Sequence, residues 1–324
     1  MLLILNDLRK ELNNMLDNPF EPVVKIDAFK SAFDDSELDF PVRTSQLHLD
    51  FMPNKDNKAV IRDEPDGIKV QDWWIVGTDY HVKSHRDFHE PIWEEIVNNF
   101  DPEDIDDVEV KLKSSRQGRW GLIDYKFPSI NYKITTTNNH STTITFRLLV
   151  WTGLDGKTAN NFMLGAIDGY CTNGMVFSSD PKSITKLYKR NTKGFCMKGF
   201  VSTLGMASQL FYDKAKEYQL MASKRMTWQQ TIDFIDKLKM AEYKLDSLKQ
   251  LAGDERIQRG DNLFSLHSAL TNYSSHNDQL DFENKPMFRT RKTKHDSANE
   301  NMFKRELEVA DIFQGKEWKE LLAA

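Results

Sequence analysis

Basic and aromatic side chains are interleaved through the middle of the chain, between residues 111 and 198. Lysine and arginine attract phosphates by charge and by counterion release, and flat rings can stack on exposed bases. Both kinds of residue in one segment are typical of a surface that binds single-stranded nucleic acid. The residues assigned to this predicted surface are Lys111, Lys113, Arg116, Arg119, Trp120, Lys126, Lys133, Arg147, Lys182, Lys186, Tyr188, Lys189, Arg190, Lys193 and Lys198.

The charge of the chain is unevenly distributed, although the formal net charge of all 324 residues is only -5. Residues 1–110 hold 11 Lys and Arg against 26 Asp and Glu, residues 111–225 hold 18 against 6, and residues 226–324 hold 15 against 17. The middle third, at +12, favours a polyanionic partner, and a solvated basic face is the alternative. The N-terminal third, at -15, could cover that surface or pair with the basic face of a neighbouring subunit. We therefore expect a homo-oligomer, built as a ring or a filament.

Two other patterns suggest phosphate or metal chemistry and have simpler explanations. Asp155-Gly156-Lys157-Thr158 resembles the end of a phosphate-binding loop, but Trp151 stands where that motif requires a glycine, so a turn is predicted. His81, His85 and His89 recur at a metal-like spacing, which the exposed face of an amphipathic helix explains equally well. We expect no metal and no cofactor.

Nothing in the sequence requires an enzyme. Cys171 and Cys196 have no Cys-x-x-Cys partner, and no serine lies in a Gly-x-Ser-x-Gly motif. Two cysteines fit a reducing compartment, and no apolar stretch is long enough to span a membrane. These features predict a cytoplasmic, non-enzymatic protein that does not insert into a membrane.

The expected fold class is α+β, with a central antiparallel β-sheet meander, one early helix and a helical C-terminal region. Residues 1–70 are expected to form an acidic, proline-broken N-terminal region with a short helix over 3–16. Residues 17–70 are expected to be irregular and extended, with one or two short elements, and the polar cluster at 54–58 is predicted to be a loop. Residues 71–200 form the β-rich core, which opens with a strand at 73–76, a turn and a short strand at 80–82. Ser84 is then expected to cap a helix that runs to Phe100.

Six strands separated by short turns follow, which favours antiparallel neighbours. They are expected at 108–114, 119–127, 130–136, 142–151, 160–167 and 170–177. Residues 201–324 are predicted to be mostly helical, with a polar, mobile stretch between the third helix and the last. The first helix is expected over 199–222, and the second runs from the capping box of Thr227 and Gln230 to a stop at Gly253. The third helix is capped by Asp261, and the last is expected over 301–322, around Gly315.

The run Tyr170-Cys171-Thr172-Asn173-Gly174-Met175 resembles the signature of a phage- and plasmid-borne family known as domain of unknown function 932. Residues 74–82 look like the first hairpin of that family, and residues 262–276 like its late helix. A basic residue commonly precedes the family's cysteine by three positions, and here that position is Asp168, so any phosphate contact of that residue would be moved or lost. Cys171, Asn173 and Gly174 are expected to form a structural turn, because Asn-Gly readily takes positive φ.

The order of sheet and helices in this family is similar to that of phage single-strand annealing proteins. The resemblance implies a single-stranded DNA-binding protein of phage or mobile-element origin, acting in the host bacterial cytoplasm and promoting annealing or recombination. The alternative is a non-enzymatic phage structural or host-takeover protein that acts through protein partners. A nuclease or another metal enzyme would need clustered carboxylates, which spacing alone does not reveal.

Overall fold

The structure is a computed structural model that describes residues 23–34, 36–50, 52–63, 71–115, 118–154, 156, 160–169, 174–176, 203–276 and 294–323. The strands in these ranges are β1 (Val42–Leu49), β2 (Met52–Arg62), β3 (Gln71–Gly77), β4 (Glu109–Ser115), β5 (Trp120–Thr135), β6 (Ser141–Gly153), β7 (Asn161–Asp168) and β8 (Gly174–Val176). The helices are α2 (Val23–Asp34), α3 (His85–Asn99), α4 (Pro102–Ile105), α7 (Ala207–Ser223), α8 (Trp228–Asp236), α9 (Glu242–Arg259), α10 (Leu263–His276), α12 (Lys294–Gln314) and α13 (Lys316–Ala323).

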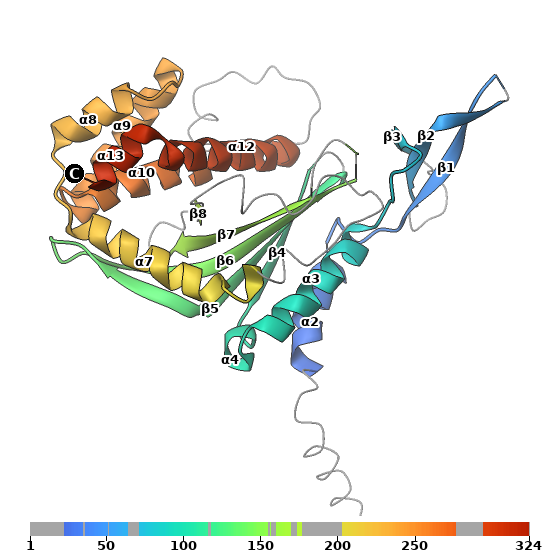
Figure 1. Ribbon diagram of the computed structural model, residues 1–324, viewed down its shortest axis with the longest axis horizontal. Helices are drawn as coiled ribbons and strands as arrows, with labels where there is room; N and C mark the ends of the chain where they lie inside the picture. The colour runs from blue at the N-terminus through green and yellow to red at the C-terminus, as the bar shows by residue number, and fades with distance from the viewer. Residues whose placement is uncertain are drawn as a thin grey trace, which may run out of the picture.

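The larger sheet has five strands in the order β4-β5-β6-β7-β8, and every neighbouring pair is antiparallel (Figure 1). Strands that follow each other in the chain are therefore neighbours in the sheet, as the short turns predict. The predicted antiparallel meander and the mixed α+β class are confirmed. The two strands expected at 119–127 and 130–136 are a single strand, β5, whose register shifts between Phe127 and Asn131.

One face of this sheet packs on α2, α3 and α7 and forms the main core. Tyr125 and Phe127 of β5 are fully buried there, and the Phe127 ring stacks on Phe100 with 4.7 Å between ring centroids. The same apolar cluster reaches from Phe29 in α2 to Trp318 in α13. The N-terminal, central and C-terminal parts of the described chain therefore share one core.

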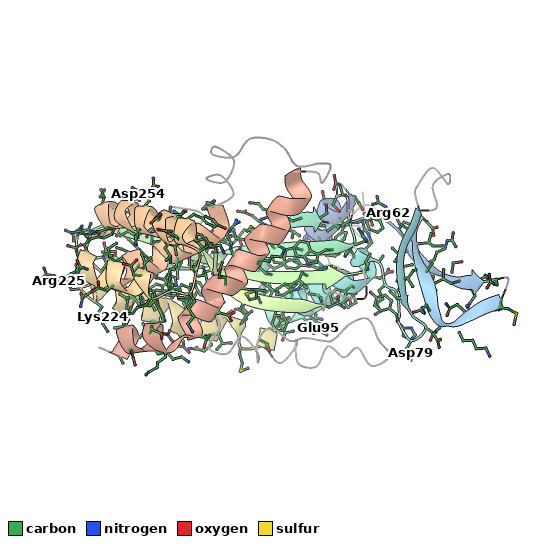
Figure 2. The ribbon with its side chains drawn as sticks, turned by 90° about the horizontal axis from the view of Figure 1, so that it is seen from above. Arg62, Asp79, Glu95, Lys224, Arg225 and Asp254 are labelled. Carbon is green, nitrogen blue, oxygen red and sulfur yellow. The ribbon has the colours of Figure 1, made fainter. Side chains whose placement is uncertain are left out.

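The opposite face of the sheet lies under α12, which crosses the strands (Figure 2). Ala310, Met302 and Leu307 of this helix pack against a smaller apolar cluster on that face. The sheet residues of the cluster are Trp120, Leu122, Leu149, Trp151 and Met163. The sheet is therefore covered, at least in part, on both sides.

The smaller sheet, in the order β1-β2-β3, extends away from the rest of the molecule (Figure 1). It is anchored at its base by a third apolar cluster around Phe40, Val60 and Val76. There Tyr80 Oη donates a hydrogen bond to the carbonyl of Gly153 at 3.0 Å, which links the base of this sheet to the end of β6.

The prediction of an irregular stretch over 17–70 is wrong for the part of it that the structure describes. That part contains α2, β1 and β2, and the polar run at 54–58 lies inside β2. The distal half of the β1–β2 hairpin is solvated on both faces, so it lacks the apolar alternation that identifies a strand. The helix expected over 3–16 lies outside the described residues.

The helix after Ser84 is confirmed as α3, with the side chains of Ser84 and Asp87 forming a reciprocal capping box. The short strand expected at 80–82 is absent among the described residues, because β3 pairs with β2 instead. The helix predicted to run from the capping box of Thr227 to Gly253 is two helices, α8 and α9. Gly253 lies inside α9, and the stop is Gly260, whose φ is 87°.

Asn262 rather than Asp261 caps α10, because its side-chain oxygen accepts a hydrogen bond from the Ser265 amide at 3.0 Å. Part of the polar stretch expected to be mobile is helical, since α12 begins at Lys294. Among the described residues, no helix combines the length and the apolar composition needed to cross a membrane.

Candidate nucleic-acid interface

Strand periodicity places the predicted cations of β4, β5 and β6 on one face of the five-stranded sheet. Residues that pair across antiparallel strands share a face, and successive residues alternate between faces. Lys111 pairs with Asp124, and Lys126 pairs with both Glu109 and Arg147. Beyond the irregularity in β5, Lys133 pairs with Thr143 on the same side. This face, which includes Lys111, Lys113, Lys126, Lys133 and Arg147, is here called the polar face.

Three of these cations lie toward the solvent. The Lys111 side chain is 68% exposed and lies 3.5 Å from Glu109, and Lys133 is also exposed. Lys126 is more covered and donates to Glu109 Oε1 at 3.0 Å. This hydrogen bond, aided by the charge of Lys111, lowers the pKa of Glu109. Because Glu109 is shared by two lysines, it only partly neutralises this edge of the polar face.

The other two cations of the polar face are turned toward α12. Lys113 is half-buried, with its Nζ 3.5 Å from the sulfur of Met302. Arg147 is buried and forms ion pairs with Glu306 of α12 at 2.9 Å and with Asp124 of β5 at 3.5 Å. Burial opposes the charge of Arg147, but the two carboxylates raise its pKa above the ordinary value. Arg147 is therefore not presented to a phosphate in this structure, because α12 covers it.

Trp120 also differs from its predicted role as a stacking surface for bases. It is only 4% exposed and belongs to the apolar cluster under α12. Arg119, at the start of the same strand, is half-buried, and its carbonyl accepts a hydrogen bond from the Leu154 amide at 2.7 Å. The remaining predicted contacts lie outside the described residues: Arg116, Lys182, Lys186, Tyr188, Lys189, Arg190, Lys193 and Lys198.

Gly174 has a structural role that differs from the predicted one. It begins β8, where it pairs with Ile167, and it is not among the glycines with positive φ. A Cβ atom at this position would overlap Nη2 of Arg147 and lie 2.9 Å from Glu306 Oε1. Any larger residue would therefore force the buried Arg147–Glu306 pair to shift, because the pair packs directly against the backbone of Gly174. Cys171 and Asn173, the other residues of the predicted turn, lie outside the described residues.

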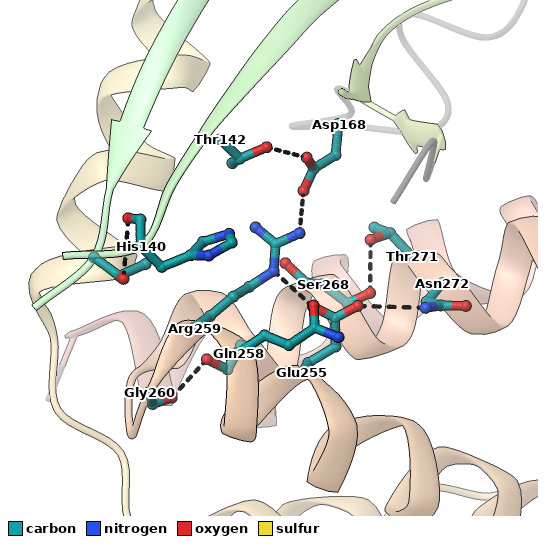
Figure 3. Close-up of polar contacts among 12 residues, drawn as sticks. His140, Thr142, Asp168, Glu255, Gln258, Arg259, Gly260, Ser268, Thr271 and Asn272 are labelled. Carbon is teal, nitrogen blue, oxygen red and sulfur yellow. Dashed lines mark hydrogen bonds and ion pairs between the residues drawn. The ribbon is translucent and has the colours of Figure 1, made fainter. Parts of the chain in front are cut away.

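Asp168, at the end of β7, lies in a second buried charge network (Figure 3). It accepts hydrogen bonds from the hydroxyl of Thr142 and, at 2.7 Å, from Nη2 of Arg259. Arg259 Nε also donates to Glu255 Oε2 at 2.6 Å, and the other carboxylate oxygen of Glu255 accepts from Asn272 at 3.3 Å. The network joins the end of β7 to α9 and α10.

This second network was not predicted from the sequence. Glu255 and Arg259 have the i,i+4 spacing of a helical ion pair, which is the one local signal that could have pointed to it. That spacing is also common on solvated helix faces, so it does not indicate burial. The ion pairs it forms are fully buried, which marks the network as structural.

The prediction that the spaced histidines lie on an exposed helix face is wrong for two of the three, because His85 and His89 are fully buried. The Nε2 atom of His85 lies 2.6 Å from the Gly118 carbonyl, which can only accept, so Nε2 carries the proton and Nδ1 accepts from the Thr152 hydroxyl. His89 is buried next to Phe33 and Phe88, and neither of its ring nitrogens has a hydrogen-bond partner among the described residues. His81 is exposed. In the described part of the chain, no group of three or more His, Cys, Asp or Glu could hold a metal ion.

No protein-family model matches this sequence, and no curated protein and no solved structure matches it either.

Proposed function

We propose that the chain binds single-stranded nucleic acid, with part of the contact made by the polar face of its five-stranded sheet. The observation that carries the proposal is the alternation that brings Lys111, Lys126 and Lys133 to one side of β4 and β5. Two of the three side chains are exposed, so a phosphate backbone could reach them. Such contacts supply affinity that depends on charge and not on sequence.

Glu109 weakens the attraction of this face for phosphates. Each phosphate that approaches Lys111 or Lys126 must compete with the carboxylate that both lysines already contact. The three lysines alone therefore give modest affinity with a strong dependence on salt. The proposal assigns the rest of the binding to the cations between residues 182 and 198, which carry six of the fifteen predicted contacts together with Tyr188.

The test is an electrophoretic mobility shift with a labelled oligonucleotide across a range of salt concentrations. Lys111→Glu combined with Lys133→Glu should weaken binding and reduce the log–log salt slope by roughly 0.7 for each lost phosphate contact of a single strand. The matched control is Lys237→Glu combined with Lys316→Glu, two exposed lysines in the helical part of the chain. If both double variants bind equally well, the polar face does not contact nucleic acid.

We further propose that binding serves strand annealing or recombination in a bacterium that carries a phage or a mobile element. This part rests on the resemblance to the phage and plasmid family and on the similar order of sheet and helices. A strand-annealing assay with two complementary oligonucleotides tests it. If the protein binds both strands but does not accelerate their pairing, the proposal of annealing fails and the proposal of binding stands.

The second candidate is a phage protein that acts through protein partners, and the smaller sheet favours it. That sheet extends from the body of the molecule (Figure 1). Two of its apolar residues, Met52 and Ile75, are 71% and 62% exposed. Exposed apolar side chains on a projecting sheet are suited to contacts with another chain. A second copy would give the homo-oligomer that the charge distribution predicts, and light scattering at low and high salt tests for it.

A further inference from the structure

A cavity of about 170 Å³ lies among four helices of the C-terminal region, far in sequence from the polar face. Pockets for drug-sized ligands measure about 300–1,000 Å³, so this one suits a single ring system. Its lining comes from α7, α10, α12 and α13 and includes Tyr218, His267, Phe313, Trp318, Lys319 and Leu322.

Four of the ten residues that line this cavity carry aromatic rings. His267 lies nearly parallel to Phe313, with 4.6 Å between ring centroids and 14° between their planes. Tyr218 contacts His267 at 4.5 Å, and Trp318 contacts Phe313 at 4.8 Å, both pairs being tilted. Aromatic walls of this kind favour a flat, polarisable ligand, because such a ring stacks on one wall and meets others edge-on.

His267 gives the aromatic wall a hydrogen-bonding group. Its Nδ1 is buried and has no hydrogen-bond partner among the described residues. Burial, together with the nearby charges of Lys214 and Arg259, lowers the pKa of His267 to about 3, so the ring is neutral near pH 7. A neutral imidazole can donate through one nitrogen and accept through the other, which suits the mixed donor and acceptor edge of a heterocycle.

The rim of the cavity carries a net positive charge. Lys214 and Glu217 form an ion pair with each other, which leaves the ammonium group of Lys319 as the surplus charge. Lys319 is exposed, and no ion pair joins it to a carboxylate among the described residues. A ligand with an anionic group beside its ring would therefore be attracted to the α13 side of the cavity.

We propose that this cavity binds a nucleotide, with the base among Tyr218, His267 and Phe313 and the phosphate near Lys319. The ligand chemistry is a heteroaromatic ring joined to a phosphate, and it has two sources: a free mononucleotide, or one unstacked base of a single strand. The site is separate from the polar face of the sheet, so it does not depend on the function proposed for that face.

The test is equilibrium dialysis of the full chain against radiolabelled deoxynucleoside monophosphates, with a labelled oligonucleotide as the second arm. Leu322→Trp should obstruct the mouth of the cavity, and Lys319→Glu should weaken binding at least about tenfold by reversing the charge beside the phosphate. The matched control is Lys316→Glu on the same helix, whose partner is Glu320 and which does not line the cavity. Circular dichroism confirms that each variant is folded.

The two arms identify the source of the ligand. Loss of mononucleotide binding in Leu322→Trp and Lys319→Glu, but not in Lys316→Glu, assigns the cavity to a free nucleotide. Weakening of oligonucleotide binding alone assigns it to a base of a strand. If neither ligand distinguishes these variants from the wild type, the proposal is overturned. Lys111→Glu with Lys133→Glu should leave mononucleotide binding unchanged, which keeps this result separate from that of the sheet.

Discussion

The carboxylate of Asp168 accepts a hydrogen bond from the guanidinium of Arg259 at 2.7 Å, and both side chains are fully buried. Asp168 ends β7, and Arg259 ends α9, 91 residues later in the chain. The pair therefore fixes the helical C-terminal region to the end of β7.

Asp168→Asn should destabilise the fold by about 3 kcal/mol, because it removes the carboxylate charge that faces a buried guanidinium. Chemical unfolding followed by circular dichroism measures the change. The control is Asp63→Asn, which breaks the exposed ion pair between Asp63 and Arg43 and should cost less than about 1 kcal/mol. Equal effects of the two substitutions would mean that the buried pair contributes no more than a surface one.

Gly174→Ala should destabilise the fold by at least about 1–3 kcal/mol, because the added methyl group overlaps the guanidinium of Arg147. Gly253→Ala is the matched control. A Cβ at Gly253 would come no closer than 3.8 Å to a neighbouring atom, and the position lies inside α9. That substitution should stabilise the chain by up to about 1 kcal/mol. Thermal melts measure the stability of both variants. If Gly174→Ala leaves the stability unchanged, the packing described for β8 is contradicted.

The features predicted correctly from the sequence are those that depend on near neighbours in the chain. Ser84 stands directly before the helix that it caps, and the meander follows from strands joined by short turns.

The features that were missed depend on distant segments. Arg147 and Glu306 are 159 positions apart, and no local pattern indicates that α12 covers the polar face. A basic residue on a strand therefore looks the same in the sequence whether it faces a phosphate or a buried carboxylate. The wall of the C-terminal cavity likewise comes from four helices, so His267 could not be distinguished from an ordinary core residue.

Acid should destabilise the fold in part through His85. Burial lowers the pKa of His85 from 6.5 to about 4, so between these pH values the unfolded chain holds more protons than the folded one. The free energy of unfolding therefore falls as the pH drops through this window, by up to about 3 kcal/mol from this residue alone. His89 and His267, whose pKa values are also lowered by burial, add to the fall in the same direction.

His85→Gln isolates the contribution of this residue. It should lower the stability above pH 6.5, since one or both of the bonds to Thr152 and Gly118 are lost. It should also flatten the decline in stability between pH 6.5 and about pH 4, the window set by the two pKa values. His48→Gln, on the exposed strand β1, is the control and should leave the curve unchanged. Urea unfolding at several pH values measures both variants. A wild-type slope retained in His85→Gln would show that His85 does not resist protonation.

Variants of the Arg147–Glu306 pair test whether Arg147 is a structural cation or a phosphate-binding one. Arg147→Met and Glu306→Met should each cost about 3–5 kcal/mol, because each leaves a buried charge without its main partner. The double variant should cost less than the sum of the two, with a coupling energy of about 0.5–3 kcal/mol. At temperatures where Arg147→Met remains folded, the salt slope of oligonucleotide binding should equal that of the wild type, since α12 covers this side chain. A reduced slope in a variant of unchanged stability would instead place Arg147 in contact with phosphate and require α12 to leave the sheet when nucleic acid binds.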